Sequence, residues 1–172
     1  MRKLKAKSLS DDEAGYKLKA DQGFTILEFL VVISIIVLVA TIIIIPFKQF
    51  RDNQVLDNTV NDVLAVLADA RGKTLSSEGD SQYGVNFVSD LATLFKGDTF
   101  LGAGTLGNEE IEINYPATLS TISLTGGGSS IVFERLTGTT ANSGTIVISL
   151  SNSEPQTRTI IISSAGVVSL EL

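Results

Sequence analysis

An apolar segment near the N-terminus constrains this chain more than any other feature. The seventeen residues 29–45 carry no charge, and their only polar members are Ser34 and Thr41. Residues 24–45 together would form a helix of about 33 Å at roughly 1.5 Å per residue, close to the bilayer hydrocarbon core of about 30 Å. We expect one membrane-spanning helix, because the core helix of a soluble protein would carry a polar face.

The charge on either side of this segment predicts its orientation. Residues 1–23 carry six Lys and Arg against four Asp and Glu, and the rest of the chain carries seven against fifteen. Because basic residues gather on the cytoplasmic side, we expect a cytoplasmic N-terminus and an exported C-terminal region. The segment is longer than the apolar part of a signal peptide and no small-x-small cleavage site follows it, so we expect it to remain in the mature protein.

The apolar pattern changes at Pro46. Beyond it the apolar residues form a stripe with helical spacing, which predicts an amphipathic continuation of the helix to about Arg71, with Gly72 as its C-cap. Pro46 removes a backbone hydrogen bond and crowds the carbonyl of Ile42, so we expect a kink or local break there. The stripe consists of Phe50, Leu56, Val60, Val63, Leu64 and Leu67, with Asp52, Asp57, Asp62 and Asp69 elsewhere.

The remaining sequence is rich in Gly, Ser and Thr, with short β-branched runs between turn signals. These runs predict strands at 83–88, 110–115, 121–124, 130–135, 145–150, 157–162 and 167–170. The pattern at 90–96 is ambiguous and allows a helical turn. The loops "TGGGSS" (125–130) and "SSAG" (163–166) are typical of hairpins. We therefore predict an α+β fold, in which an antiparallel sheet of one or two layers packs on the amphipathic half of the helix.

Residues 23–28, Gly-Phe-Thr-Ile-Leu-Glu, stand directly ahead of the uncharged stretch. A charge at the centre of a bilayer costs roughly 2.5–3.5 kcal/mol, so an acid inside a membrane helix is a candidate functional residue. The other interpretation of Glu28 is that it lies at headgroup level and reaches water.

This motif resembles the class III signal of type IV prepilins and pseudopilins, and the resemblance continues through "LVVISIIVLVA" to Pro46. The tail, with its Ala165-Gly166 turn, is most similar to the minor pilin or H-type minor pseudopilin branch. The resemblance implies a pilin-like subunit of a type IV pilus or of a type II secretion pseudopilus. It divides the chain into a cytoplasmic leader (1–23), a transmembrane and assembly helix (24–46), its amphipathic continuation (47–72) and a β-rich extracytoplasmic head (73–172).

The same resemblance implies a set of site residues and partners. A prepilin peptidase and methyltransferase would cut after Gly23 and methylate the new amine of Phe24. Glycine suits such a cut because it allows an extended backbone in a tight cleft. Glu28 would pair with the terminal ammonium of a neighbouring subunit, whose charge methylation preserves, and Pro46 would also take part in assembly. The implied partners are the peptidase, other pilin or pseudopilin subunits and the inner membrane. From the residues themselves we expect no cofactor and no metal.

Composition limits the other functions. With no His and no Cys, the sequence excludes His-dependent triads, thiol nucleophiles, the usual zinc sites and disulfides. Glu109, Glu110 and Glu112 could pair or bind calcium, but Glu110 and Glu112 would share one face of a strand as a solvated edge. From residue 78 onward the sequence contains three basic and ten acidic residues, which argues against nucleic-acid binding. The alternative that stays open is an unprocessed, signal-anchored surface β-domain with a binding role.

Overall fold

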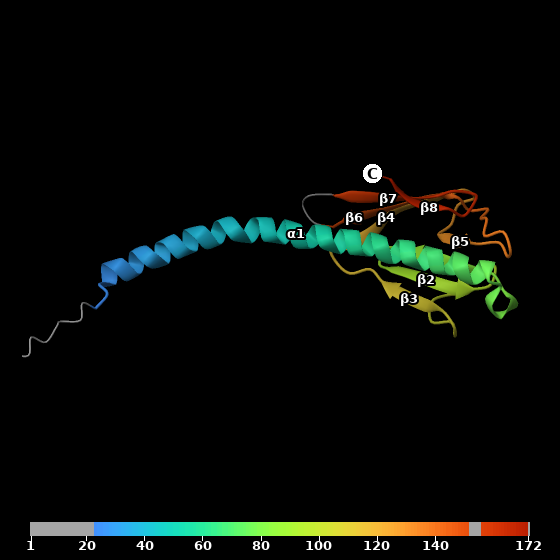
Figure 1. The fold of residues 1–172 in the computed structure, drawn as a ribbon, viewed down its shortest axis with the longest axis horizontal. Coiled ribbons are helices and arrows are strands. Elements are labelled where there is room, and N and C mark those ends of the chain that lie inside the picture. Colours follow the sequence, from blue (N-terminus) through green and yellow to red (C-terminus); the bar gives the residue numbers. More distant parts are fainter. Residues whose placement is uncertain (1–22, 152–155, 172) are drawn as a thin grey trace, which may run out of the picture. The chain divides into compact units, whose positions relative to one another are not determined.

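The computed structural model describes residues 23–151 and 156–171, apart from the side chains of 44–46. The chain divides into two compact units between Ile42 and Ile43. The elements run in the order α1 (Ile26–Leu75), η1 (Glu78–Asp80), β1 (Tyr83–Val88), β2 (Leu91–Lys96), β3 (Glu109–Glu112), β4 (Ala117–Leu124), β5 (Ser130–Val132), β6 (Gly144–Leu150), β7 (Thr157–Ile162) and β8 (Val168–Glu171) (Figure 1).

Helix α1 is a single element of 50 residues. It passes through Pro46 without a change of secondary structure, so the expectation of a local break there is wrong, while a kink remains a prediction. It also passes Gly72 and ends at Leu75, so Gly72 is not the C-cap. The last turn continues because buried Thr74 holds it: the Thr74 hydroxyl donates to the Ala70 carbonyl at 2.8 Å and accepts the Tyr83 amide at 2.9 Å.

The second half of α1 buries an apolar stripe against the sheets. Its buried members are Leu56, Val60, Val63, Val66, Leu67 and Ala70, and Leu64 is partly buried, so most of the predicted stripe is confirmed. Two assignments were wrong: Phe50 is 61% exposed, and Asp52 is only 4% exposed. The helical period explains both, because Asp52 lies one turn before Leu56 on the buried face and Phe50 does not share that face.

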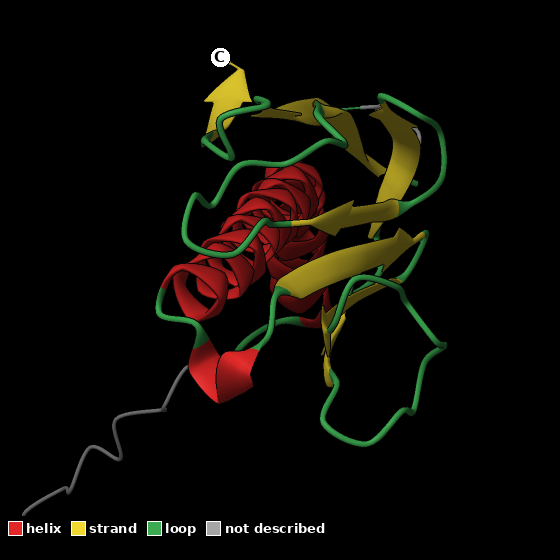
Figure 2. Cartoon of the chain, turned by 90° about the vertical axis from the view of Figure 1, so that its right-hand side faces the viewer, coloured by secondary structure: helices red, strands yellow, loops and turns green. Residues whose placement is uncertain are grey.

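The strands form two four-stranded antiparallel sheets within the described residues. The first has the order β3-β2-β1-β5 and the second the order β4-β6-β7-β8. Figure 2 shows the strands curving around one side of the helix. One core joins the three parts, with Leu67 from α1, Phe87 from the first sheet and Ile148 from the second all completely buried. The predicted α+β fold is therefore confirmed in its two-sheet form.

The strands lie close to where the sequence predicts them, except where consecutive residues are all buried and polar and apolar residues do not alternate. β1 and β7 have the predicted bounds, whereas β3 and β5 end earlier than expected. The ambiguous stretch is strand β2, not a helical turn, and it pairs with β1 along its whole length. Residues 92–95 are all buried, so β2 shows no polar and apolar alternation that could have identified it.

The two predicted hairpins have different outcomes. The loop 163–166 does join the antiparallel pair β7 and β8, so that hairpin is confirmed. The loop 125–130 does not make a hairpin, because β4 pairs with β6 and β5 pairs with β1. The segment instead crosses from the second sheet to the first, where the Ser129 carbonyl accepts the Phe87 amide at 2.8 Å.

Candidate functional site

Thr25 defines the start of the apolar helix. Its hydroxyl accepts the Glu28 amide at 3.1 Å, and its carbonyl accepts the Phe29 amide at 3.1 Å. This is an N-cap, and Thr-x-x-Glu is the spacing of a capping box. The role of Thr25 was missed in the sequence, although that spacing could have revealed it. The cap leaves Gly23 and Phe24 outside the helix.

Nothing in the described part of the chain packs against Gly23. A Cβ atom built at Gly23 meets nothing within 4 Å, and the residue does not have the left-handed backbone that favours glycine. Phe24 beside it is 83% exposed. The bond between them is therefore accessible, and no contact in the described residues accounts for a glycine at this position.

Glu28 lies in the first turn of α1 and is exposed. In the part of the chain that the structure describes, no cation lies within ion-pair distance of its carboxylate. An acid in the first turn of a helix is favoured by the macrodipole, typically by about 0.3–1 kcal/mol. That term is small beside the cost of a charge in a membrane, so the described chain offers Glu28 little compensation.

The side chains around and beyond Glu28 form a continuous apolar surface. Every described side chain from residue 26 to residue 43 is exposed. The two hydroxyls in this stretch bond within the helix, Ser34 to the Leu30 carbonyl and Thr41 to the Val37 carbonyl, both at 2.8 Å. By length and composition α1 could cross a membrane. Both hydroxyls are thus satisfied within the helix, which a lipid environment requires.

Three of the predicted site residues lie close together at the start of α1. Gly23, Phe24 and Glu28 lie within the first turn or directly before it. Pro46 lies in the second unit of the chain, and its side chain is outside the described set. A role for Pro46 in assembly stays a prediction.

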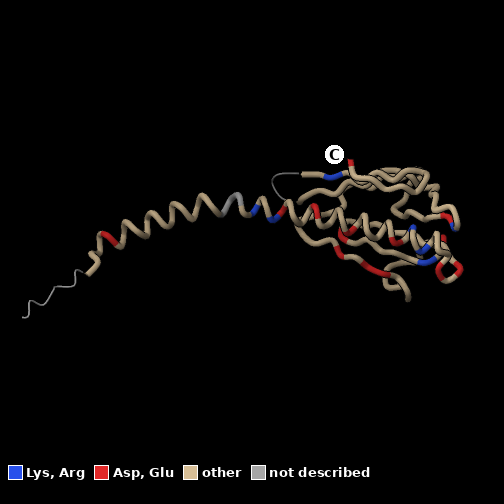
Figure 3. Tube along the Cα trace, in the orientation of Figure 1, with Lys and Arg blue, Asp and Glu red and all other residues tan. Residues whose placement is uncertain are grey.

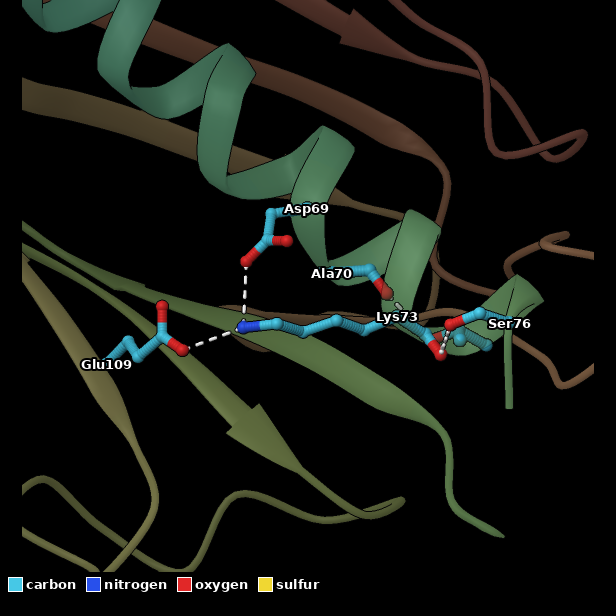
Figure 4. Close-up of polar contacts among 6 residues, drawn as sticks. Asp69, Ala70, Lys73, Ser76 and Glu109 are labelled. Carbon is cyan, nitrogen blue, oxygen red and sulfur yellow. Dashed lines mark hydrogen bonds and ion pairs between the residues drawn. The ribbon is translucent and has the colours of Figure 1, made fainter. Parts of the chain in front are cut away.

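Ion pairs connect α1 to both sheets of the head. Figure 3 marks the positions of the charged residues along the described chain. Lys73 of α1 reaches Glu109 of β3 at 2.7 Å and Asp69 at 2.9 Å (Figure 4). The hydrogen bonds to Glu109 and then Asp69 raise the pKa of Lys73 well above its ordinary value. On the other side, Arg158 of β7 reaches Asp57 of α1 at 3.2 Å. The sequence could not reveal the pairs between helix and strand, because their partners are distant along the chain.

The three glutamates of β3 have different surroundings. Glu110 and Glu112 are exposed on this edge strand, as the solvated-edge interpretation predicted, whereas Glu109 is used by Lys73. Glu110 also accepts the Gly104 amide at 2.8 Å. Among the described residues no three His, Cys, Asp or Glu side chains are placed to hold a metal ion.

Comparisons with known proteins agree with this geometry. The family profile described as the prokaryotic N-terminal methylation motif matches residues 18–44. A crystal structure of the type IV minor pilin FimU of Pseudomonas aeruginosa PAO1, in space group P21, is similar with a TM-score of 0.53 and 18% identity, over 72% of this chain and 92% of that one. A second FimU structure, in space group P65, gives a TM-score of 0.50 and 18% identity over 68% and 93%. The search of curated proteins returned no significant match.

The profile covers the predicted cut, the cap and most of the exposed apolar helix, and the structural likeness covers most of the head. Together they confirm the resemblance that the sequence suggested, once in the motif and once in the fold. The chain therefore carries the prokaryotic N-terminal methylation motif on a long helix packed against antiparallel sheets, and its fold is similar to that of a type IV minor pilin.

Proposed function

We propose that this chain is a structural subunit of a type IV pilus or of a type II secretion-like pseudopilus. It is processed after Gly23, methylated on the Phe24 amine and assembled through α1. The observation that carries the proposal is the first turn of α1. There an accessible glycine with no packing role precedes an N-capped helix, and the one acid among residues 24–45 follows a turn later on an exposed apolar surface.

The proposed processing step creates a cationic partner for Glu28, which has none among the described residues. Hydrolysis of the bond between Gly23 and Phe24 gives a carboxylate on the released leader and an ammonium on Phe24. That ammonium would weaken the N-terminus of its own helix, where the macrodipole disfavours positive charge. Pairing with Glu28 of a neighbouring subunit would compensate both charges away from water and fix the axial register of the two helices.

The exposed apolar surface of α1 would serve twice. Before assembly it would anchor the subunit in the inner membrane, with the leader in the cytoplasm and the head outside. After assembly it would pack against other α1 helices in the filament core. Moving from lipid to a helix bundle changes the neighbours of the surface more than the polarity around it, so extraction need not expose it to water.

Each region of the chain has a role in this function, and each role requires a partner. Residues 1–23 are the leader, 24–46 the anchor and assembly helix, 47–72 its continuation and 73–172 the head. The partners are a prepilin peptidase and methyltransferase, other pilin or pseudopilin subunits, and the membrane. The role is structural and not enzymatic, in keeping with the similarity of the fold to that of a minor pilin.

Intact mass and N-terminal sequencing of the membrane-extracted protein test the proposal directly. The expected chain begins at a methylated Phe24. A chain that begins at Met1 would favour the second candidate, a signal-anchored surface β-domain that is neither processed nor assembled. That candidate is consistent with the exposed apolar helix, but it gives Gly23 and Glu28 no role.

A further inference from the structure

The loop between β2 and β3 exposes two large apolar side chains. Leu101 is 81% exposed and Leu106 is fully exposed, at 102%. A single exposed leucine is ordinary on a protein surface. Two on one loop of twelve residues, 97–108, give this loop an apolar surface that the rest of the described head does not cover.

This loop is ordered by its own contacts. The Thr105 hydroxyl and the Asn108 side-chain amide both donate to the Gly102 carbonyl, at 2.9 and 3.1 Å. At its base the rings of Phe95 and Phe100 lie 5.4 Å apart, centre to centre. The loop therefore presents its leucines in a fixed arrangement, and binding through them would require little further ordering.

The head also has an apolar groove of about 440 Å³ between α1 and the hairpin that leads into β8. β8 is an edge strand, with β7 as its one partner among the described residues. Leu75 and Val167 in the groove are 39% and 54% exposed. The lining residues that matter here are Leu64, Ala68, Leu75, Val167 and Val168, together with Arg71.

The loop and the groove have complementary charge. Residues 97–112 contain no Lys or Arg, and their acids outside the pair of Glu109 with Lys73 are Asp98, Glu110 and Glu112. Among the described residues that line the groove, Arg71 alone is charged. Its guanidinium donates to the Gly138 carbonyl at 3.1 Å and to the Ala165 carbonyl at 3.4 Å, which positions it with further N–H groups to donate. An acidic loop entering the groove would meet a fixed positive charge.

The two features cannot meet within one head. β3, which follows the loop, and β8, which lines the groove, lie on opposite sides of α1 (Figure 1). A contact between them therefore needs two molecules. It is heterologous, since each molecule contributes a different surface, and such contacts generate open helical arrays when they do not close into a ring.

We infer that the loop 97–108 of one copy of this chain inserts Leu101 and Leu106 into the groove between α1 and β8 of the next copy. The inference rests on the proposed filament role and extends it, because it adds a contact between heads to the contact between helices. The acidic residues beside the loop orient it toward Arg71, and the leucines cover the apolar lining.

The absence of cysteine from the sequence allows a clean test. Two differently tagged full-length chains, one Leu106→Cys and one Val167→Cys, are produced in the same cells and treated with a short bis-maleimide linker. We expect a mixed dimer at least about tenfold above the level from a Val88→Cys and Val167→Cys pair. Val88 is a matched control, since it is 44% exposed and lies outside both the loop and the groove.

A second variant tests whether the cross-link reports docking of the loop or only random encounters of the two cysteines. Adding Leu101→Asp to the Leu106→Cys chain should reduce the mixed dimer to the Val88 level. Leu101 is exposed, so the change should leave the head folded, and resistance of the head to protease checks this. A mixed dimer no more abundant than the Val88 control, or one that Leu101→Asp leaves unchanged, overturns the inference.

The outcome also separates this inference from the proposed function. If the chain starts at methylated Phe24 and enters sheared filaments but gives no mixed dimer, the docking inference fails and the subunit role stands. If the mixed dimer forms on a chain that starts at Met1, the docking inference stands and the proposed processing fails.

Discussion

At the scale of single residues, Gly23 and Glu28 have one thing in common. The described residues neither explain the glycine nor offset the charge of the acid, and the proposed peptidase and neighbouring subunit would account for them. A Cβ at Gly23 would meet nothing within 4 Å, and Glu28 has no described cation near it. Thr25 between them is explained by the fold, because it caps α1. The separation of these roles allows them to be tested by substitution.

Replacing Gly23 with Val should block leader removal and leave the fold intact. The branched side chain would clash in a peptidase cleft that requires a narrow extended backbone, whereas it has open space in the chain itself. Immunoblotting of membranes should show only the longer precursor. Gly72→Ala is the matched control, since its Cβ also meets nothing within 4 Å, and it should be processed normally. Normal processing of Gly23→Val would contradict the proposed cut.

Replacing Glu28 with Ala should preserve processing and abolish assembly. The substitution removes the charge that would pair with a neighbour's Phe24 ammonium, and it also removes the insertion cost of about 2.5–3.5 kcal/mol, so the chain should stay in the membrane. The amount of mature chain in sheared filaments should fall at least about tenfold. Glu112→Ala, an exposed acid on β3, should assemble as wild type. Equal incorporation of both variants would remove Glu28 from the assembly site.

At the scale of elements, α1 is one continuous helix whose two halves have different surroundings. Residues 26–43 expose every described side chain, while the second half buries one face under two sheets. The buried face is apolar, but it is fastened at its margins by ion pairs, Lys73 with Glu109 on one sheet and Arg158 with Asp57 on the other. These pairs join α1 to β3 and to β7.

Replacing Lys73 with Met should lower the free energy of unfolding by roughly 1 kcal/mol, since its carboxylate partners are solvent-exposed and screened. The folded pKa of Lys73 is raised above the ordinary 10.5, so the stabilisation is fully present below pH 10.5 and is lost as pH rises through the folded pKa. The difference in melting temperature between wild type and Lys73→Met in detergent should stay constant from neutral pH to pH 10.5, where the carboxylates are ionised, and should narrow above it.

Lys96→Met is the control for this measurement. Lys96 is exposed on β2, and the described residues give it no ion pair. Its replacement should change the free energy of unfolding by less than about 0.5 kcal/mol at every pH. A gap for Lys73→Met that persists unchanged far above the ordinary lysine pKa would show that the lost stability comes from packing and not from charge.

At the scale of the whole molecule, the head must close without a disulfide, since the chain has no cysteine. In the structure the turn before β8 does this by close packing. Gly166 lies so near Gly138 that a Cβ on Gly166 would come within 1.8 Å of the Gly138 carbonyl oxygen. Arg71 of α1 donates to carbonyls on both sides of this junction, Gly138 and Ala165. The C-terminal hairpin is thus held to the helix and to the loop that precedes β6.

Replacing Gly166 with Ala should destabilise the head more than a Gly→Ala change with the same backbone in open space. Gly127→Ala is the matched control: it also has a left-handed backbone, with φ of 76° against 72°, but its Cβ meets nothing within 4 Å. We expect a loss of about 1–2 kcal/mol for Gly127→Ala from backbone strain, and a further loss of about 1–3 kcal/mol for Gly166→Ala from overpacking. Thermal unfolding measures both, and equal losses would mean that the junction does not close the head.

The sequence by itself determined the features that local pattern encodes. The exposed apolar segment, the motif at Gly23, Phe24 and Glu28, the stripe on α1 and strands β1 and β7 each show their character within a few neighbouring residues. Tertiary structure decided what depends on distant partners. Residues 91–96 form a strand with four consecutive buried residues, and residues 125–129 connect one sheet to the other. Asp52 is buried, and Lys73 pairs with Glu109. Periodicity records which face of an element is apolar, but pairing between elements depends on residues far apart in the chain.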